Sequence, residues 1–260
     1  MFMSLRGGLG ELIHTLVKRL DTQQVILESG MPVQEIKISK FPRQPIGVIL
    51  DHERILEADA VIVSTPSFCS ARLLRPTCEE LATALDEIPY ASTATVSLGY
   101  KTEQIRSSIQ GYGFVVPRKE NRALLAATWT SLKWQDRSRP EHTLIRCYVG
   151  GRGRESFVDM DDRQLGKVIT GELAALAGIT AVPHVTNVHR WDHGMPQYVL
   201  GHHDRLTKIQ GLLKAFPGLH LAGAAFRGIG IPDCIQDGMR TGQNVVQELG
   251  TARGSHSAET

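Results

Sequence analysis

The chain has 260 residues, a formal net charge of +2 and 42% hydrophobic residues, a composition that excludes a disordered or fibrous protein. Its acidic and basic residues are so nearly balanced that the charge does not indicate a nucleic acid or an anionic membrane as a partner. The four cysteines form no CxxC pair and are typical of reduced thiols, so we predict a cytoplasmic protein. No apolar run reaches ~18 residues, and no transmembrane segment is therefore predicted.

The first ninety residues are predicted to contain helices and short strands. A 3.6-residue apolar period predicts a helix near the start of the chain, with an apolar stripe formed by Leu9, Leu12, Ile13, Leu16, Val17 and Leu20. Strands are predicted over 25–27, 33–38, 46–50 and 60–64, and the last is a continuous apolar run of the kind that is buried on both faces. Helices are expected from about residue 67 and over 79–85.

The middle of the chain has a different pattern. Four β-rich segments separated by polar turns, at 93–100, 113–116, 124–128 and 143–149, predict a separate and largely antiparallel sheet. Asp161 or Asp162 is expected to cap the helix that follows. Residues 182–189 are expected to be extended.

The last third of the chain is predicted to hold a helix through Leu206 and Leu213, a strand at 219–222 and a helix over 233–249. Residues 251–260 are polar and are predicted to form a disordered tail. In the turn before the last helix, Gly228 and Gly230 allow the backbone to approach a flat ligand, and free amides at the positive helix end face that ligand. An ordinary strand–helix connection with glycines accounts for the same spacing.

Other kinds of site receive little support. His189 and His193 have the i, i+4 spacing that aligns metal ligands only on a helix, and Gly194 and Pro196 argue against a helix there, so we predict no metal site. The sequence contains no G-x-S-x-G elbow and no phosphate-binding G-x-x-x-x-G-K-[ST] loop. We therefore assign no catalytic residue from the sequence.

Six segments in a fixed order carry a family resemblance. They are Ser4–Leu9 (SLRGGL), 32–36 (PVxxI), Val61–Pro66 (VIVSTP), Gly111–Pro117 (GYGFVVP), Trp191–His202 (WxxxMPQYxxGH) and Leu221–Ile235 (LAG…GIGIPDCI). With them the chain resembles the oxygen-dependent protoporphyrinogen and coproporphyrinogen oxidases, which are FAD enzymes of the amine-oxidase-like flavoprotein superfamily. The similarity runs from about residue 2 to residue 250.

One part of the family pattern is absent from this sequence. The family begins with a strand, a G-x-G-x-x-G turn and a helix that hold the FAD pyrophosphate. Gly8-Leu9-Gly10 lacks the third glycine, and Gly228-Ile229-Gly230 is followed by Asp233 where a glycine belongs. The chain thus resembles the C-terminal part of such an enzyme, and an N-terminal FAD-binding half on a separate chain is an expected partner.

The resemblance implies roles for individual residues. For FAD it implies contacts from Val33, Trp191, Ile229, Gly230 and Ile231, and for the porphyrinogen a pocket lined by Tyr112, Val115 and Tyr148. Arg118 or Arg227 is a candidate for a propionate contact, because a guanidinium binds a carboxylate through two hydrogen bonds. A solvated surface position is the alternative for both arginines.

The expected fold is α/β with mixed α+β character. A partial FAD-binding, Rossmann-like domain (1–66 and 197–250) would be interleaved with a mixed-sheet substrate domain (67–196). The function that the resemblance implies is oxidation of protoporphyrinogen IX or coproporphyrinogen III to the porphyrin in haem biosynthesis, with hydride transfer to the flavin and O2 as acceptor. The sequence leaves the choice of porphyrinogen open, and it allows peripheral contact with a membrane.

Two alternatives stay open. The first is another flavoenzyme of the same superfamily, an amine oxidase or a carotenoid desaturase. The second is an inactive fragment that needs a separate nucleotide-binding half, and it rests on the absent glycine fingerprint.

Overall fold

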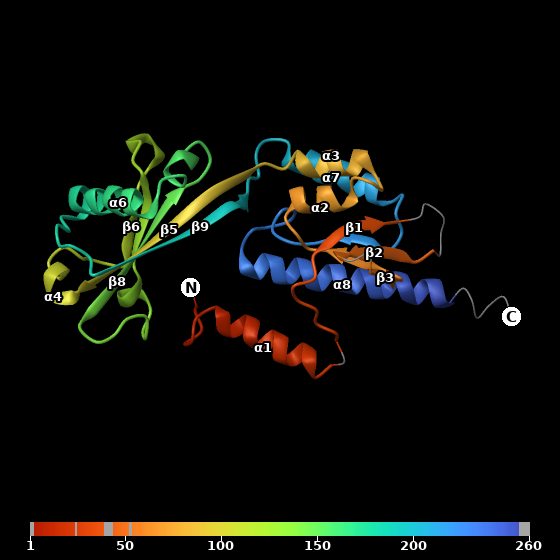
Figure 1. Cartoon of the computed structure of the whole chain (residues 1–260), viewed down its shortest axis with the longest axis horizontal. Helices are drawn as coiled ribbons and strands as arrows, with labels where there is room; N and C mark the ends of the chain where they lie inside the picture. The colour runs from red at the N-terminus through yellow and green to blue at the C-terminus, as the bar shows by residue number, and fades with distance from the viewer. Residues whose placement is uncertain (1–2, 24, 39–43, 52–53, 255–260) are drawn as a thin grey trace. The chain divides into compact units, whose positions relative to one another are not determined.

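The fold is described with a computed structural model, which describes residues 3–23, 25–38, 44–51 and 54–254 (Figure 1). The chain divides into two compact units. Unit 1 combines residues 1–27 with Tyr90–Met195, and unit 2 combines Glu28–Pro89 with Pro196–Thr260. Two interleaved parts are what the sequence predicts, but the boundaries differ from the predicted ones.

Local contacts explain the two largest differences in the boundaries. The start of the chain belongs to unit 1 because the Arg137 guanidinium donates to the Leu5 carbonyl at 2.8 Å and Arg6 pairs with Asp136 at 3.1 Å. Residues 67–89, which we assigned to the substrate domain, belong to unit 2 because their helices pack on the strands and helices of that unit.

Unit 1 is built on a five-stranded sheet with the strand order β6-β7-β8-β5-β9. The strands are β5 (Tyr90–Lys101), β6 (Gly113–Val115), β7 (Leu124–Trp129), β8 (His142–Gly150) and β9 (Val185–Pro196). The pairs β5–β8, β7–β8 and β6–β7 are antiparallel, as the turn-separated β-rich segments predicted. Short helices α4 (Thr102–Ile105) and α5 (Thr130–Lys133) follow β5 and β7.

One face of this sheet is covered by helix α6 (Asp162–Ala177), whose N-terminus is capped by Asp161 through a 2.8 Å hydrogen bond from Gln164 N–H. Along much of β5, β7 and β8, buried residues alternate with less buried or exposed ones, and the buried set packs with Leu165, Ile169 and Leu173 of α6. Alternation on a strand places successive side chains on opposite faces. The sheet therefore has one face in the core and one open face.

Helix α1 (Gly10–Asp21) forms where the apolar period predicted it. Its stripe is not buried: Leu9, Ile13, Leu16 and Val17 are between 46% and 58% exposed. The strand predicted at 25–27 is wrong, because these residues have no regular secondary structure and pair with no described strand.

Unit 2 contains two small sheets. Strands β1 (Val33–Lys37), β2 (Ile46–Leu50) and β3 (Ile55–Ala58) form an antiparallel sheet, and β4 (Val61–Val63) pairs in parallel with β10 (Leu219–Leu221). Strand β3 was not predicted, because its four residues show no alternation of apolar and polar side chains. The strand forms by pairing with β2. Ile62 is 42% exposed, so β4 is not buried on both faces as predicted.

The helices of unit 2 are α2 (Ser67–Leu74), α3 (Glu79–Asp86), α7 (His202–Leu213) and α8 (Ile231–Gly254). Helices α2, α3 and α7 lie together on one side of the strands and α8 lies on the other (Figure 1). Helix α8 continues through Gly254, so residues 251–254 are helical and not part of a tail; residues 255–260 lie outside the described part. None of the helices in the described residues is long and apolar enough to cross a bilayer.

We expect Leu165→Ala to lower the free energy of unfolding by about 2–5 kcal/mol, because it removes a fully buried side chain beneath the sheet and leaves a cavity. Leu176→Ala on the same helix is the matched control, since Leu176 is 38% exposed, and it should cost less than about 1 kcal/mol. Urea unfolding followed by circular dichroism measures both. Equal losses in the two variants would contradict the described packing of α6.

Candidate functional site

The open face of the unit 1 sheet carries two of the three predicted substrate residues in one row. Val115 on β6 is opposite Ala126, Ala126 is opposite Tyr148 on β8, and Tyr148 is opposite Thr95. Val115 is 79% and Tyr148 37% exposed, whereas their strand neighbours Val116 and Cys147 are buried. Tyr112 lies in the turn before β6 and is also exposed. The row is a flat, mainly apolar surface with one aromatic ring.

Trp191 lies on the same open face. Its neighbour Arg190 points to the α6 side, where it donates to the carbonyls of Val158 and Met160 and pairs with Asp162 at 2.6 Å. Because side chains alternate along β9, Trp191 is on the opposite face. Its ring is in edge-to-face contact with that of His189, with centroids 4.4 Å apart. The tryptophan that we predicted next to the flavin is therefore part of unit 1.

Buried Cys147 lies beneath the open face. Burial raises the pKa of its thiol to about 12 and also raises the pKa of the neighbouring Tyr100 hydroxyl. Both groups stay protonated at neutral pH, so they contribute packing and no nucleophile or base.

In unit 2, the glycine-rich turn after β10 is held by side chains of the Trp191–His202 segment. The Tyr198 hydroxyl donates to the Ala224 carbonyl at 2.7 Å and accepts from Gly228 N–H at 2.8 Å. The His202 ring stacks on that of Tyr198, with centroids 4.0 Å apart, and its Nε2 is 3.3 Å from the Phe226 carbonyl. These contacts fix the turn from one side.

Asp237 on α8 fixes the turn from the other side. The carboxylate is 2% exposed, accepts from Gly223 N–H at 3.0 Å and pairs with Arg227 at 2.6 Å and Arg240 at 3.1 Å. Burial acts to raise the pKa of Asp237, but the Gly223 hydrogen bond and the two arginines outweigh it and lower the pKa. Arg227 is thereby engaged within the protein, which disfavours its predicted propionate contact.

The glycines of the turn make room for a protein side chain. A Cβ at Gly228, whose φ is +143°, would lie 2.5 Å from the Cβ of Asp233, and Gly230 N–H donates to the Asp233 carboxylate at 3.3 Å. The space that we expected a flat ligand to need is thus occupied at these two positions by Asp233. The FAD contact that the resemblance implies for Gly230 stays a prediction.

The remaining features of the turn fit a flavin. The N–H groups of Ile229 and Ile231 have no acceptor among the described residues, and their side chains are 52% and 47% exposed. Two free amides next to apolar surface, at the positive end of the 24-residue helix α8, suit the acceptor-rich edge of a planar ring. Val33 begins β1 in the same unit and pairs with Leu50.

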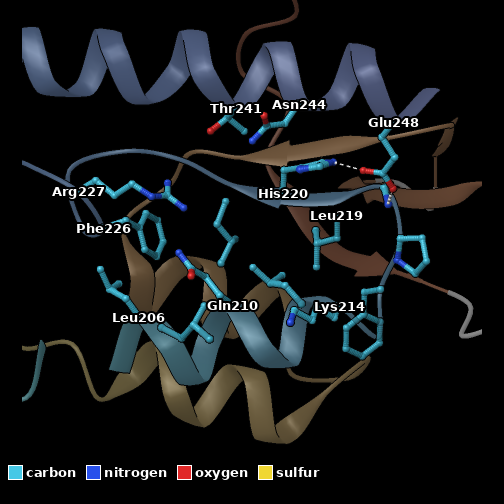
Figure 2. Close-up of a pocket in the computed structure, with 16 residues that line it drawn as sticks. Leu206, Gln210, Lys214, Leu219, His220, Phe226, Arg227, Thr241, Asn244 and Glu248 are labelled. Atoms are coloured by element: carbon cyan, nitrogen blue, oxygen red, sulfur yellow. Dashed lines mark hydrogen bonds and ion pairs between the residues drawn. The ribbon is translucent and has the colours of Figure 1, made fainter. Parts of the chain in front are cut away.

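A cavity of about 370 Å³ lies along the outer edge of β10 (Figure 2). Helix α7 supplies Leu206 and Gln210 on one side, and α8 supplies Thr241, Asn244 and Glu248 on the other. His220 on β10 pairs with Glu248 at 3.0 Å, and Glu248 also accepts from Gly218 N–H at 2.9 Å. The cavity is flanked by a helix on each face of the sheet.

The main chain of β10 has unused hydrogen-bonding groups in this cavity. Val61 N–H donates to Gly218 O at 2.8 Å and Ala222 N–H donates to Val63 O at 3.1 Å, which directs residues 218, 220 and 222 toward β4. Leu219 and Leu221 face the opposite way. Both are about 95% buried, yet the Leu221 N–H and C=O have no partner among the described residues. Such groups in a protein interior are almost always paired.

Sequence reasoning missed several functional candidates. Arg146 lies on the open face between Ser97 and Thr128, and neither its spacing nor a motif distinguished it from other surface arginines. Tyr198 and His202 were inside a quoted segment, but only the structure shows that they hold the glycine turn. Arg118 is exposed on a short 3-10 turn, and its carbonyl accepts from Arg154.

The five histidines near residues 184–203 include the pair His189 and His193, whose spacing was considered for a metal site. His189 and His193 lie on strand β9, and within the described ranges no three histidine, cysteine, aspartate or glutamate side chains are grouped to hold an ion.

Comparisons with known proteins define the family. Residues 1–246 match the family model described as flavin containing amine oxidoreductase, and the chain therefore belongs to this family. It is 35% identical over 240 residues to coproporphyrinogen III oxidase of Bacillus subtilis, covering 91% of this chain and 49% of the relative. It is 31% identical over 260 residues to human protoporphyrinogen oxidase, covering 95% and 52%.

A solved structure supports the same assignment. A protein from Exiguobacterium sp. 255-15, assigned as a protoporphyrinogen oxidase, superimposes with a TM-score of 0.80 at 29% identity, over 95% of this chain and 52% of the other. The mixed α/β fold that we predicted is thus confirmed. The chain spans about half the length of the relatives that it matches.

We expect Asp237→Asn to lower the free energy of unfolding at pH 7 by about 1.5–3 kcal/mol, because Gly223 N–H, Arg227 and Arg240 lose a charged hydrogen-bond acceptor. The pKa of Asp237 is lowered in the folded state, so its contribution is complete above the unfolded pKa of ~3.9 and is lost as the pH falls through the folded value. The difference between wild type and variant should therefore narrow below about pH 4.

Urea unfolding at several pH values measures this difference. Asp204→Asn, at an exposed position in the first turn of α7, is the control and should cost less than about 1 kcal/mol. A difference for Asp237→Asn that does not change with pH would contradict the stabilising role of the ionised carboxylate.

Proposed function

We propose that this chain is one half of a flavin-dependent porphyrinogen oxidase, which oxidises protoporphyrinogen IX or coproporphyrinogen III to the porphyrin in the cytoplasm, with O2 as the final acceptor. The observation that carries the proposal is the row Val115–Ala126–Tyr148–Thr95 on the open face of the unit 1 sheet. In addition, the porphyrinogen oxidases among its relatives align with more than nine-tenths of this chain.

The open face suits a broad tetrapyrrole. A macrocycle is bound mainly through apolar and aromatic contacts, with a few polar groups that fix its orientation. Val115, Tyr148 and Trp191 supply that surface, and Tyr112 extends it at the end of β6. The sheet is rigid because its other face packs on α6, so the side chains of the face are positioned before the substrate binds.

The glycine turn of unit 2 would hold the flavin. Ile229 and Ile231 would donate their free amides to the ring edge, while Asp237 and Tyr198 keep the turn in shape. When bound, the flavin supplies the electron-accepting chemistry that side chains do not provide. The protein contributes orientation, exclusion of water and stabilisation of negative charge near the helix end.

The partner in this proposal is the half of the family fold that this chain does not match, carried on a separate chain or on a longer one. A strand of that half would pair with the outer edge of β10. The cavity along this edge, which α7 and α8 both line, and the unpaired Leu221 groups support the position. The partner half is expected to bring the missing G-x-G-x-x-G turn.

The experiment combines the purified chain with the part of the Bacillus subtilis relative that this chain does not match, together with FAD. We expect the two polypeptides and flavin absorbance to co-elute in gel filtration, and the complex to turn coproporphyrinogen III or protoporphyrinogen IX into fluorescent porphyrin. A complex that retains FAD but oxidises only amines would contradict the proposed substrate class.

Bulky side chains in the cavity test the position of the partner strand. Gln210→Trp and Asn244→Trp place an indole in the cavity from α7 and α8, and we expect at least a tenfold weaker association in each. Gln243→Trp is the control, because Gln243 is exposed on α8 and does not line the cavity. Unchanged association in both cavity variants would show that the partner does not use this edge.

A further inference from the structure

Arg146 occupies the centre of the open face of the unit 1 sheet. Its cross-strand partners are Ser97 on β5 and Thr128 on β7, so an exposed guanidinium lies between two hydroxyl-bearing side chains. The next row along β8 is the Tyr148 row. Residues two apart on a strand project from the same face about 6.6 Å from each other, which places Arg146 beside the apolar row.

The charge of Arg146 is not neutralised by the protein. Arg227 and Arg190 pair with Asp237 and Asp162, but Arg146 makes no ion pair with any described residue. The open-face positions of β5 to β9 carry no aspartate or glutamate, and the face also bears His189. A cation flanked by hydroxyl groups, beside an apolar and aromatic surface, is a binding arrangement for a carboxylate on a flat hydrophobic ligand.

We propose that Arg146 binds a propionate of a tetrapyrrole that lies on the Tyr148 row, and that it favours substrates with more carboxylates. This inference rests on the function proposed above. Coproporphyrinogen carries a propionate on each of its four rings. Whichever ring lies next to Arg146 when the macrocycle is rotated in its plane, a propionate therefore reaches the guanidinium. Protoporphyrinogen carries propionates on two adjacent rings only, and fewer of its orientations satisfy the guanidinium. Arg146 is thus a specificity-determining residue for the number of carboxylates.

The test is a fluorescence titration with stable porphyrins, performed on the full chain and on its complex with the partner half. The probes are coproporphyrin III, its tetramethyl ester and protoporphyrin IX. We expect Arg146→Gln to weaken coproporphyrin III binding at least tenfold, because a charge-assisted pair of hydrogen bonds is lost. Binding of the ester should change less than twofold, and Arg146→Lys should restore part of the affinity for the acid.

Arg163→Gln is the matched control, since Arg163 is exposed on α6, away from the open face, and it should leave all three affinities unchanged. Circular dichroism verifies that each variant is folded. If wild type binds coproporphyrin III and Arg146→Gln binds it equally well, the role of Arg146 is wrong and the proposed function stands. If wild type binds none of the porphyrins in either form, the proposed function fails together with this inference.

Discussion

A buried main-chain group must find a hydrogen-bond partner, and the outer edge of β10 is where this chain leaves that requirement unmet. Leu221 is 6% exposed, its N–H and C=O face the cavity between α7 and α8, and no described residue pairs with them. A two-stranded parallel sheet is also too small to be stable by itself. Helices α7 and α8 flank the cavity along this edge.

Several side chains of unit 2 hold the turn that follows this strand. Asp237 binds the first amide of the turn and two arginines, Tyr198 binds the turn at two further points, and Asp233 fills the space that Gly228 and Gly230 provide. The turn is thus rigid before any ligand binds, and preorganised amides are what favour a ligand that gathers negative charge. In unit 1 the packing of α6 has the equivalent effect, because it fixes the side chains of the opposite face.

Periodicity and turn residues were sufficient to predict most elements, including the antiparallel sheet, the Asp161 cap and the strand before the glycine turn. They failed where tertiary pairing decides the outcome: β3 is defined by its pairing with β2, whereas 25–27 pairs with no described strand. At the site, the resemblance led to Val115 and Tyr148, which share a row. Arg146 could not be found this way, because what distinguishes it is its cross-strand neighbours, which are 49 and 18 residues away in sequence.

The most direct test of the central claim is hydrogen exchange at the Leu221 amide, measured by NMR on the chain alone and with the partner half. In the chain alone this amide should exchange much faster than the His220 and Ala222 amides, which face β4. On addition of the partner half it should become protected to a similar degree as its neighbours. Protection of Leu221 in the chain alone, or fast exchange that persists in the complex, would contradict the account of β10 as an incomplete sheet edge.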